Sequence, residues 1–198
     1  MPVRLACKSA LAAMLMLAAV PSPVLAEQAN GAGYAADRAE IEDLMSRYLF
    51  AMDYGDLESY VATFTEDGEI EFASGTYKGR ENIYTAVKRF KDGIGQFYTT
   101  EDGNPAALRH VLLQMVVRVE GDRAWTTSLW TEMANNGPGD CFKMGTFGIY
   151  KDELERVDGR WLFAKRVVLN EFIDGRESGP GNPVREIDAA AAAFLGTQ

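Results

Sequence analysis

The sequence predicts an α+β fold, because helical patterns fill its first half and strand patterns fill its second half. In the first half, apolar residues recur at three- and four-residue spacing, which is typical of amphipathic helices. In the second half, four long segments of strand character are separated by tight-turn residues, which is typical of an antiparallel meander. No internal repeat or second domain boundary is found. We therefore expect one domain, in which a curved sheet wraps over the first helix.

Residues 1–26 have the features of a secretory signal peptide. Arg4 and Lys8 precede an apolar stretch, and Val24-Leu25-Ala26 supplies the small-residue pattern that favours cleavage. The apolar stretch is shorter than the ~20 residues that a spanning helix needs. We expect cleavage after Ala26, a periplasmic or secreted protein without a stable membrane anchor, and a loose leader at 27–35.

The composition excludes several classes of partner and cofactor. A formal net charge of −9 gives no electrostatic basis for binding nucleic acid or an anionic bilayer. After signal cleavage Cys141 is the one cysteine, so an internal disulfide cannot form. One histidine, one cysteine and scattered acids give no metal-ligand spacing, and no phosphate loop or nucleophile elbow is present. We expect chemistry without a metal or cofactor.

The helices and short strands of the first half follow from local patterns. Asp37 is placed to cap the first helix and Gly55 to end it, while Asp56 is placed to cap the second. Glu66-Asp67-Gly68 is typical of a turn. The expected elements are helices at 36–54, 57–64 and 80–90, strands at 69–72 and 76–78, and an ordered loop at 91–106.

The second half is expected to form four long strands. Gly121-Asp122 and Asp158-Gly159 are typical of tight hairpin turns, and residues 135–139 make a longer connection. After Phe172 the chain is rich in turn residues. The expected strands are 108–120, 123–134, 144–157 and 161–172; a final segment at 185–195 is either a terminal helix or a frayed end.

Several short motifs occur in a fixed order across residues 36–172. They are Tyr48-x-x-x-x-Asp53-x-x-Asp56, Phe64-x-x-Asp67-Gly68-x-Ile70, Gly79-Arg80-x-x-Ile83, Arg109-His110, Val119-x-Gly121-Asp122-x-Ala124 and Tyr150-x-Asp152-x-Leu154-x-Arg156-x-Asp158-Gly159-x-Trp161. This order resembles the NTF2-like superfamily and its SnoaL-like branch, which includes scytalone dehydratase. The resemblance implies a cone-shaped domain at 36–174 with a deep pocket, a tail at 175–198, and assembly as a homodimer or homotrimer.

The resemblance also implies a site. Asp53 matches the helix aspartate of the dehydratase, and His110 matches its strand histidine. Phe72 stands where the dehydratase has a tyrosine that positions water. The second histidine of the dehydratase would fall near Ala134 and is absent, which implies altered chemistry or an altered substrate.

His110 is the single histidine of the chain and is expected on the pocket side of its strand. An imidazole is suited to proton transfer near neutral pH. The alternative interpretation is a core histidine that makes one structural hydrogen bond. Alternation would place these residues on one face: Leu108, His110, Leu112, Gln114 and Val116.

Asp53 lies near the C-terminal end of the first helix, where the helix dipole disfavours a carboxylate. It therefore needs a compensating partner or a function, and pairing with His110 would orient the imidazole as an acid/base dyad. The alternative is a solvated carboxylate. Tyr48 lies near the same face and either donates a hydrogen bond into the pocket or only packs.

Further residues are candidates for binding the substrate. A buried Arg166 would need an acidic partner, for which Glu71 and Asp53 are candidates, or an anionic intermediate. Phe72 and Asn170 are expected at the pocket. An aromatic-accepting wall could be formed by Tyr98, Trp130 and Phe147.

The leading hypothesis is a cofactor-free lyase that acts on a small hydroxylated, aromatic substrate. His110 would remove a proton, Asp53 would support it, and a tyrosine or Arg166 would stabilise the developing oxyanion. Elimination of water and retro-aldol loss of formaldehyde from lignin-derived aromatics use the same groups. Two alternatives stay open: a non-catalytic periplasmic ligand-binding module, and an isomerase or cyclase that uses the same pocket.

Overall fold

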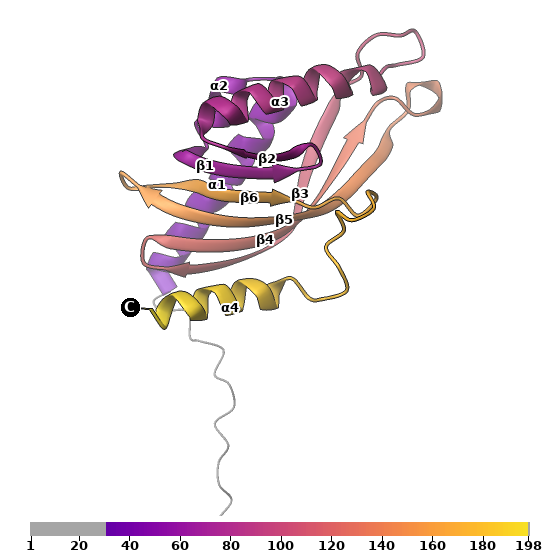
Figure 1. Ribbon diagram of the computed structural model, residues 1–198. Helices are drawn as coiled ribbons and strands as arrows, with labels where there is room; N and C mark the ends of the chain where they lie inside the picture. Colours follow the sequence, from indigo (N-terminus) through magenta and orange to yellow (C-terminus); the bar gives the residue numbers. More distant parts are fainter. Residues whose placement is uncertain (1–30, 198) are drawn as a thin grey trace, which may run out of the picture.

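A six-stranded curved sheet forms the centre of the computed structural model, which describes residues 31–197 (Figure 1). The strand order is β2-β1-β6-β5-β4-β3. β1 pairs with β6 in parallel, and all other neighbours are antiparallel. The strands are β1 (Phe64–Phe72), β2 (Gly75–Lys78), β3 (Leu108–Glu120), β4 (Arg123–Ala134), β5 (Lys143–Val157) and β6 (Arg160–Val168). The predicted α+β class and the four-stranded meander are confirmed.

Three helices pack on the inner face of the sheet. They are α1 (Gly31–Tyr54), α2 (Leu57–Val61) and α3 (Arg80–Ile94), and a 3-10 turn η1 (Gly95–Phe97) follows α3. The apolar stripe of α1, from Ile41 through Leu44 and Tyr48, is fully buried in the main core. α1 contacts both β3 and β6, so the sheet curves around it as predicted.

α4 (Val184–Leu195) covers the opposite face of the sheet. Its Ile187 and Ala191 pack on Trp125 and Val116, which point away from the main core. Ion pairs from Asp188 to Arg118 and from Glu186 to Lys151 hold the helix across β3, β4 and β5. The final segment is therefore a packed terminal helix, and in Figure 1 it lies below β4.

Several predicted boundaries differ from the observed ones. α1 begins at Gly31, so residues 31–35 are helical rather than loose, and the rest of the leader and the signal peptide lie outside the described residues. Asp37 is therefore not a cap; it binds Arg156 and accepts from Trp161 Nε1. α3 runs on to Ile94 because Lys91 and Ile94 continue its inward face.

The turn predicted at Glu66-Asp67-Gly68 is wrong, because these residues belong to β1. The strand begins at Phe64, and its register against β6 shifts between Phe64 and Glu69. Gly68 lies at this irregularity, where a Cβ would come within 2.9 Å of the carbonyl oxygen of Phe163. α2 consequently ends at Val61 rather than at Phe64, while Asp56 caps it by accepting from Ser59 N–H as predicted.

A β-bulge in β3 changes which residues face the helices. Met115 pairs with Ser128, but Leu112 pairs with Trp130, so β3 contains one extra residue between these two pairs. The bulge reverses the alternation. The predicted inward positions of Gln114 and Val116 are therefore wrong: Gln114 is exposed, and Val116 packs towards α4.

Candidate active site

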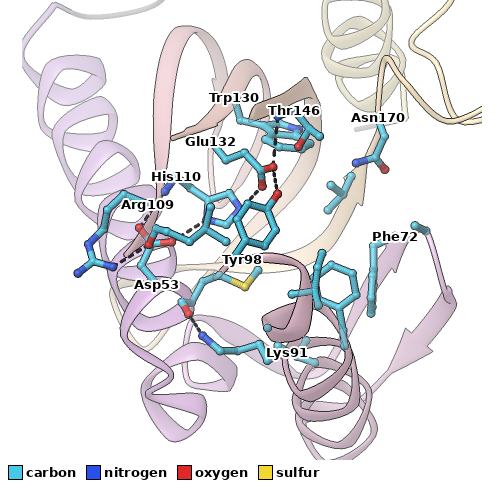
Figure 2. A pocket seen from close by; sticks show the side chains of 18 of the residues that line it. Asp53, Phe72, Lys91, Tyr98, Arg109, His110, Trp130, Glu132, Thr146 and Asn170 are labelled. Atoms are coloured by element: carbon cyan, nitrogen blue, oxygen red, sulfur yellow. Dashed lines mark hydrogen bonds and ion pairs between the residues drawn. The ribbon is translucent and has the colours of Figure 1, made fainter. Parts of the chain in front are cut away.

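A cavity of about 490 Å³ lies between the inner face of the sheet and the helices α1 and α3. This volume is within the usual range for small-molecule sites. Its lining is mostly apolar and aromatic, and Asp53, His110 and Glu132 lie together on one wall (Figure 2). The apolar residues include Met52, Ile70, Phe72, Val87, Phe90, Ile94, Phe97, Leu108, Trp130, Val168, Phe172 and Ile173.

The predicted dyad is present at this wall. Asp53 Oδ1 lies 2.6 Å from His110 Nδ1, and Asp53 Oδ2 accepts from the His110 backbone N–H at 2.9 Å. Both side chains are largely buried. Because the carboxylate is fixed by the backbone, it favours the tautomer with a proton on Nδ1 and leaves Nε2 free. The partner that Asp53 needs at a helix C-terminus is therefore His110.

Glu132, which the sequence analysis missed, faces the other nitrogen of the imidazole. Its Oε2 lies 3.8 Å from His110 Nε2. Its Oε1 accepts from the Tyr98 hydroxyl and, at 3.2 Å, from the Thr146 backbone N–H. His110 thus lies between two buried carboxylates, as Figure 2 shows.

The bulge in β3 explains why Glu132 was missed. The hairpin at Gly121-Asp122 sets a register that would bring Met133 opposite His110, whereas one extra residue brings Glu132 there instead. A signal was present in the sequence, because Glu132 is an acid among apolar and hydroxyl residues in a strand predicted to be buried. Because the bulge could not be predicted, the position of Glu132 in its strand did not reveal that it lies opposite His110.

Tyr48 lines the cavity, but its hydroxyl belongs to a buried pair. It accepts from the Tyr60 hydroxyl at 2.8 Å, and both rings are fully buried in the core. Burial raises the pKa of Tyr48 and, more strongly, that of Tyr60. Tyr48 therefore forms part of the floor of the cavity.

The aromatic wall is largely as predicted. Phe72, Tyr98, Trp130 and Asn170 all line the cavity, and Asn170 faces it from the side opposite Glu132 (Figure 2). Phe147 does not line it, because its side of β5 is exposed. Burial and the hydrogen bond to Glu132 raise the pKa of Tyr98, which keeps this phenol protonated as a donor.

The predicted pocket positions of Arg166 and Glu71 are wrong, whereas the predicted burial of Arg166 and its need for an acidic partner are confirmed. Arg166 is fully buried beneath the floor and pairs with Asp152 through Nε at 2.7 Å and Nη2 at 2.9 Å. Its partner is neither Glu71 nor Asp53, and it does not line the cavity. Glu71 points to the other side of β1, where it binds Arg176 at 2.7 Å. Alternation from Phe72 explains this placement.

Lys91 is a second residue that the sequence analysis missed. It reaches the cavity from α3 and donates to the carbonyl oxygen of Met52 in the last turn of α1. Burial lowers its pKa, and the nearby Asp53 carboxylate partly offsets this effect. Lys91 therefore ties α3 to the helix end that carries Asp53.

The arrangement is suited to moving protons. His110 Nε2 and Glu132 Oε2 lie 3.8 Å apart in a largely apolar cavity, where an imidazole and a carboxyl group can act as a general base and a general acid. Within residues 31–197, no three His, Cys, Asp or Glu side chains are grouped as metal ligands would be. In the same range no helix has the length and apolarity to cross a membrane.

Comparison with known proteins agrees with the fold. Residues 33–167 match the family model of the SnoaL-like domain. An NTF2-like protein with a cystatin-like fold from Novosphingobium aromaticivorans is 23% identical; the alignment covers 78% of this chain and 90% of that one, with a TM-score of 0.57. The predicted NTF2-like fold is therefore confirmed. The search of curated proteins gave no significant match.

Two further solved structures have names that bear on chemistry or ligands. A Catenulispora acidiphila protein, solved in complex with S-DNPA, is 26% identical over 69% of this chain and 95% of its own, with a TM-score of 0.58. A Novosphingobium aromaticivorans protein that is provisionally named a scytalone dehydratase is 20% identical over 75% of this chain and 96% of its own, with a TM-score of 0.57.

Proposed function

Because this chain belongs to the SnoaL-like family, we propose that it is a cofactor-free lyase that acts by acid/base proton transfer on a small hydroxylated, aromatic substrate. One observation carries the proposal: His110 lies between Asp53 and Glu132 at one wall of a largely apolar cavity. Such a group of interacting titratable residues in a pocket is a feature of catalytic sites.

His110 and Glu132 divide the chemistry between them. One mobile proton belongs to the pair Nε2 and Oε2, so the group without it is the base and the group with it is the acid. In a dehydration, the base takes the proton from carbon and the acid protonates the leaving hydroxyl, which departs as water. The substrate proton then restores the pair to its starting count, and no metal or coenzyme is needed.

A retro-aldol cleavage would use the same two groups. The base would take the proton of the substrate hydroxyl, the carbon–carbon bond would break with release of formaldehyde, and the acid would protonate the resulting carbanion. Because both reactions use the same base and the same acid, the proposal includes both. In each reaction Asp53 orients the imidazole and stabilises its protonated form.

The aromatic substrate class is supported by the lining of the cavity. Trp130, Phe72 and Phe90 line the cavity with aromatic rings, and the charged groups of the site, Asp53, His110 and Glu132, lie together at one wall. Apolar walls with a few convergent polar groups orient a ligand while burying its apolar part. The relative that was solved with S-DNPA supports binding of a small molecule in this fold.

The proposal also includes the place and the assembly of the enzyme. We place the reaction in the periplasm or outside the cell, on the basis of the pattern of residues 1–26. N-terminal sequencing of the protein from its native host tests cleavage after Ala26. A homodimer or homotrimer is proposed from the family resemblance, and light scattering of the purified protein tests it.

Activity is tested with a panel of hydroxylated aromatic compounds and with product identification by mass. Wild type should release water or formaldehyde, and His110→Gln should lower the rate by about 100-fold or more. The control is Gln114→Ala, which changes an exposed residue of the same strand. A folded His110→Gln variant with an unchanged rate would exclude the proposed base.

The same assay separates the two alternatives. A product with the mass of the substrate indicates an isomerase or cyclase. Tight binding of aromatic compounds without any product indicates a binding module.

A further inference from the structure

Four tyrosines line the cavity, and the hydroxyls of three have partners. Tyr48 and Tyr60 are bonded to each other, and Tyr98 donates to Glu132. The fourth, Tyr150 of β5, makes no hydrogen bond through its hydroxyl with any described residue, although its side chain is only 2% exposed. An unpartnered polar group at so buried a position calls for an explanation.

The hydroxyl of Tyr150 opens onto the cavity. Its oxygen is not one of the fully buried side-chain atoms that lack a hydrogen-bond partner. Because this oxygen has no partner and is not fully buried, it must be accessible, and the space next to Tyr150 is the cavity. The phenol is therefore available to a guest molecule.

The ring of Tyr150 is held rigidly. It stacks on Trp130 with 5.6 Å between ring centroids and an interplanar angle of 19°, and it meets Tyr48 edge-on. The buried guanidinium of Arg166 lies 4.3 Å from the ring centroid. A donor fixed in this way needs no reorganisation when charge develops in front of it.

Tyr150 also lies near the dyad. Burial raises the pKa of Tyr150 well above its usual value, and the negative charges of neighbouring groups, including Asp53, act in the same direction. The cation Arg166 opposes this rise without cancelling it. The phenol therefore keeps its proton and remains a donor across the working pH range.

We propose that Tyr150 is a further catalytic residue, whose hydroxyl donates a hydrogen bond to the substrate oxygen that gains negative charge as the base removes a proton. The inference rests on the proposed function and narrows its substrate class. The substrate must carry a carbonyl group that is conjugated with the reacting carbon. Negative charge then moves from that carbon onto the oxygen, where the phenol stabilises it, and no covalent bond to the protein forms.

The inference assigns a role that two other candidates cannot fill. Arg166 lies beneath the rings of Tyr48 and Tyr150 and does not line the cavity. The Tyr48 hydroxyl is engaged with Tyr60. Among the tyrosines that line the cavity, Tyr150 is the one whose hydroxyl makes no hydrogen bond with a described residue.

Tyr150→Phe tests the inference. Because the hydroxyl has no partner in the protein, its removal should leave the unfolding temperature unchanged, while kcat falls by about 100-fold and KM changes little. The matched control is Tyr84→Phe, which removes a hydroxyl that donates to Glu58 and belongs to a residue that does not line the cavity. A folded Tyr150→Phe variant with the kcat of wild type overturns the inference.

A binding experiment keeps this result separate from the proposed function. Naphtholate anions imitate a charged enolate oxygen, and their ionisation is visible by absorbance. Wild type should bind a naphtholate about 10-fold or more tightly than Tyr150→Phe does, because a charged acceptor loses its donor. Equal affinity in the two proteins, or no binding by wild type, overturns the inference. If naphtholate binding depends on Tyr150 but no substrate is turned over, the lyase proposal fails and the donor remains established.

Discussion

His110 Nε2 and Glu132 Oε2 face each other across 3.8 Å at the wall of the cavity. This separation is too long for a direct hydrogen bond but short enough for a substrate atom to contact both groups. Glu132 is held in place by two donors to its other oxygen. The geometry therefore presents a base and an acid to the same small region of a bound molecule.

Glu132→Gln should lower kcat by about 100-fold or more, because the amide keeps the shape of the side chain but cannot exchange a proton. Since Oε1 can still accept from Tyr98, the fold should be unaffected. Steady-state kinetics across pH checks this, with the exposed Glu81→Gln as the control. A Glu132→Gln variant as active as the control would assign Glu132 a structural role.

Asp53→Asn should disturb the imidazole before it disturbs the fold. An amide can still accept from the His110 backbone N–H but no longer favours a proton on Nδ1, so the tautomer changes and kcat falls by about 100-fold or more. His110 is the single histidine of the chain, so a nitrogen-detected NMR spectrum reports one imidazole. An unchanged tautomer in the variant would contradict this role.

The comparison of sequence and structure shows where local patterns are sufficient. The hairpin turns at Gly121 and Asp158 adopt positive φ where the sequence predicted turns, and β3 and β4 have the predicted bounds. The dyad of Asp53 and His110 was also predicted, because a carboxylate at a helix C-terminus needs a partner and the family resemblance matched both residues to one site. Contacts that depend on tertiary register were not predictable. The bulge that brings Glu132 to His110 has no local signature.

The error at Arg166 has a similar cause. The sequence indicated that Arg166 would be buried and would need an acid, which is correct. The acid is Asp152, which lies opposite Arg166 in the β5–β6 pairing. Because the register of that hairpin shifts between Glu153 and Leu154, the pairing could not be obtained by counting from the Asp158-Gly159 turn.

Asp152→Asn should destabilise the protein by about 3–5 kcal/mol, because it leaves the guanidinium of Arg166 buried without a counter-charge. Both side chains of the pair are fully buried. Chemical denaturation measures the free energy of unfolding. The control is Asp92→Asn, which breaks an exposed pair with Lys88 and should leave stability little changed. Equal stability of the two variants would contradict the role of the buried pair.

The protein should lose stability above about pH 10, where tyrosines of an unfolded chain ionise. Tyr48, Tyr60, Tyr98 and Tyr150 have raised pKa values when folded, so the folded state keeps protons that the unfolded state releases. Their contribution is complete below that pH and declines as the pH rises. Phenolate absorbance should show these four ionising only together with loss of near-UV circular dichroism. Their ionisation in a still folded protein would contradict the prediction.

Gly148→Ala should destabilise the sheet and reduce ligand binding. A Cβ at Gly148 would overlap the carbonyl oxygen of Leu169 and lie 3.0 Å from Trp130 Nε1. The two backbone hydrogen bonds between Ile149 and Leu169 would be lost, and the indole of Trp130 would be displaced. The control, Gly93→Ala, has open space in the last turn of α3 and should raise the unfolding temperature slightly. Thermal unfolding of both variants checks this.

The guanidinium of Arg166 lies against the rings of Tyr48, Tyr150 and Phe163. The floor of the cavity is therefore continuous with the core. We therefore expect new specificities to arise by mutation of exposed lining residues such as Phe97 and Phe172, where substitutions change the stability of the fold little. Randomised libraries at those positions should retain many soluble members, whereas libraries at the floor should yield few. The evolvability of this pocket is concentrated at its entrance.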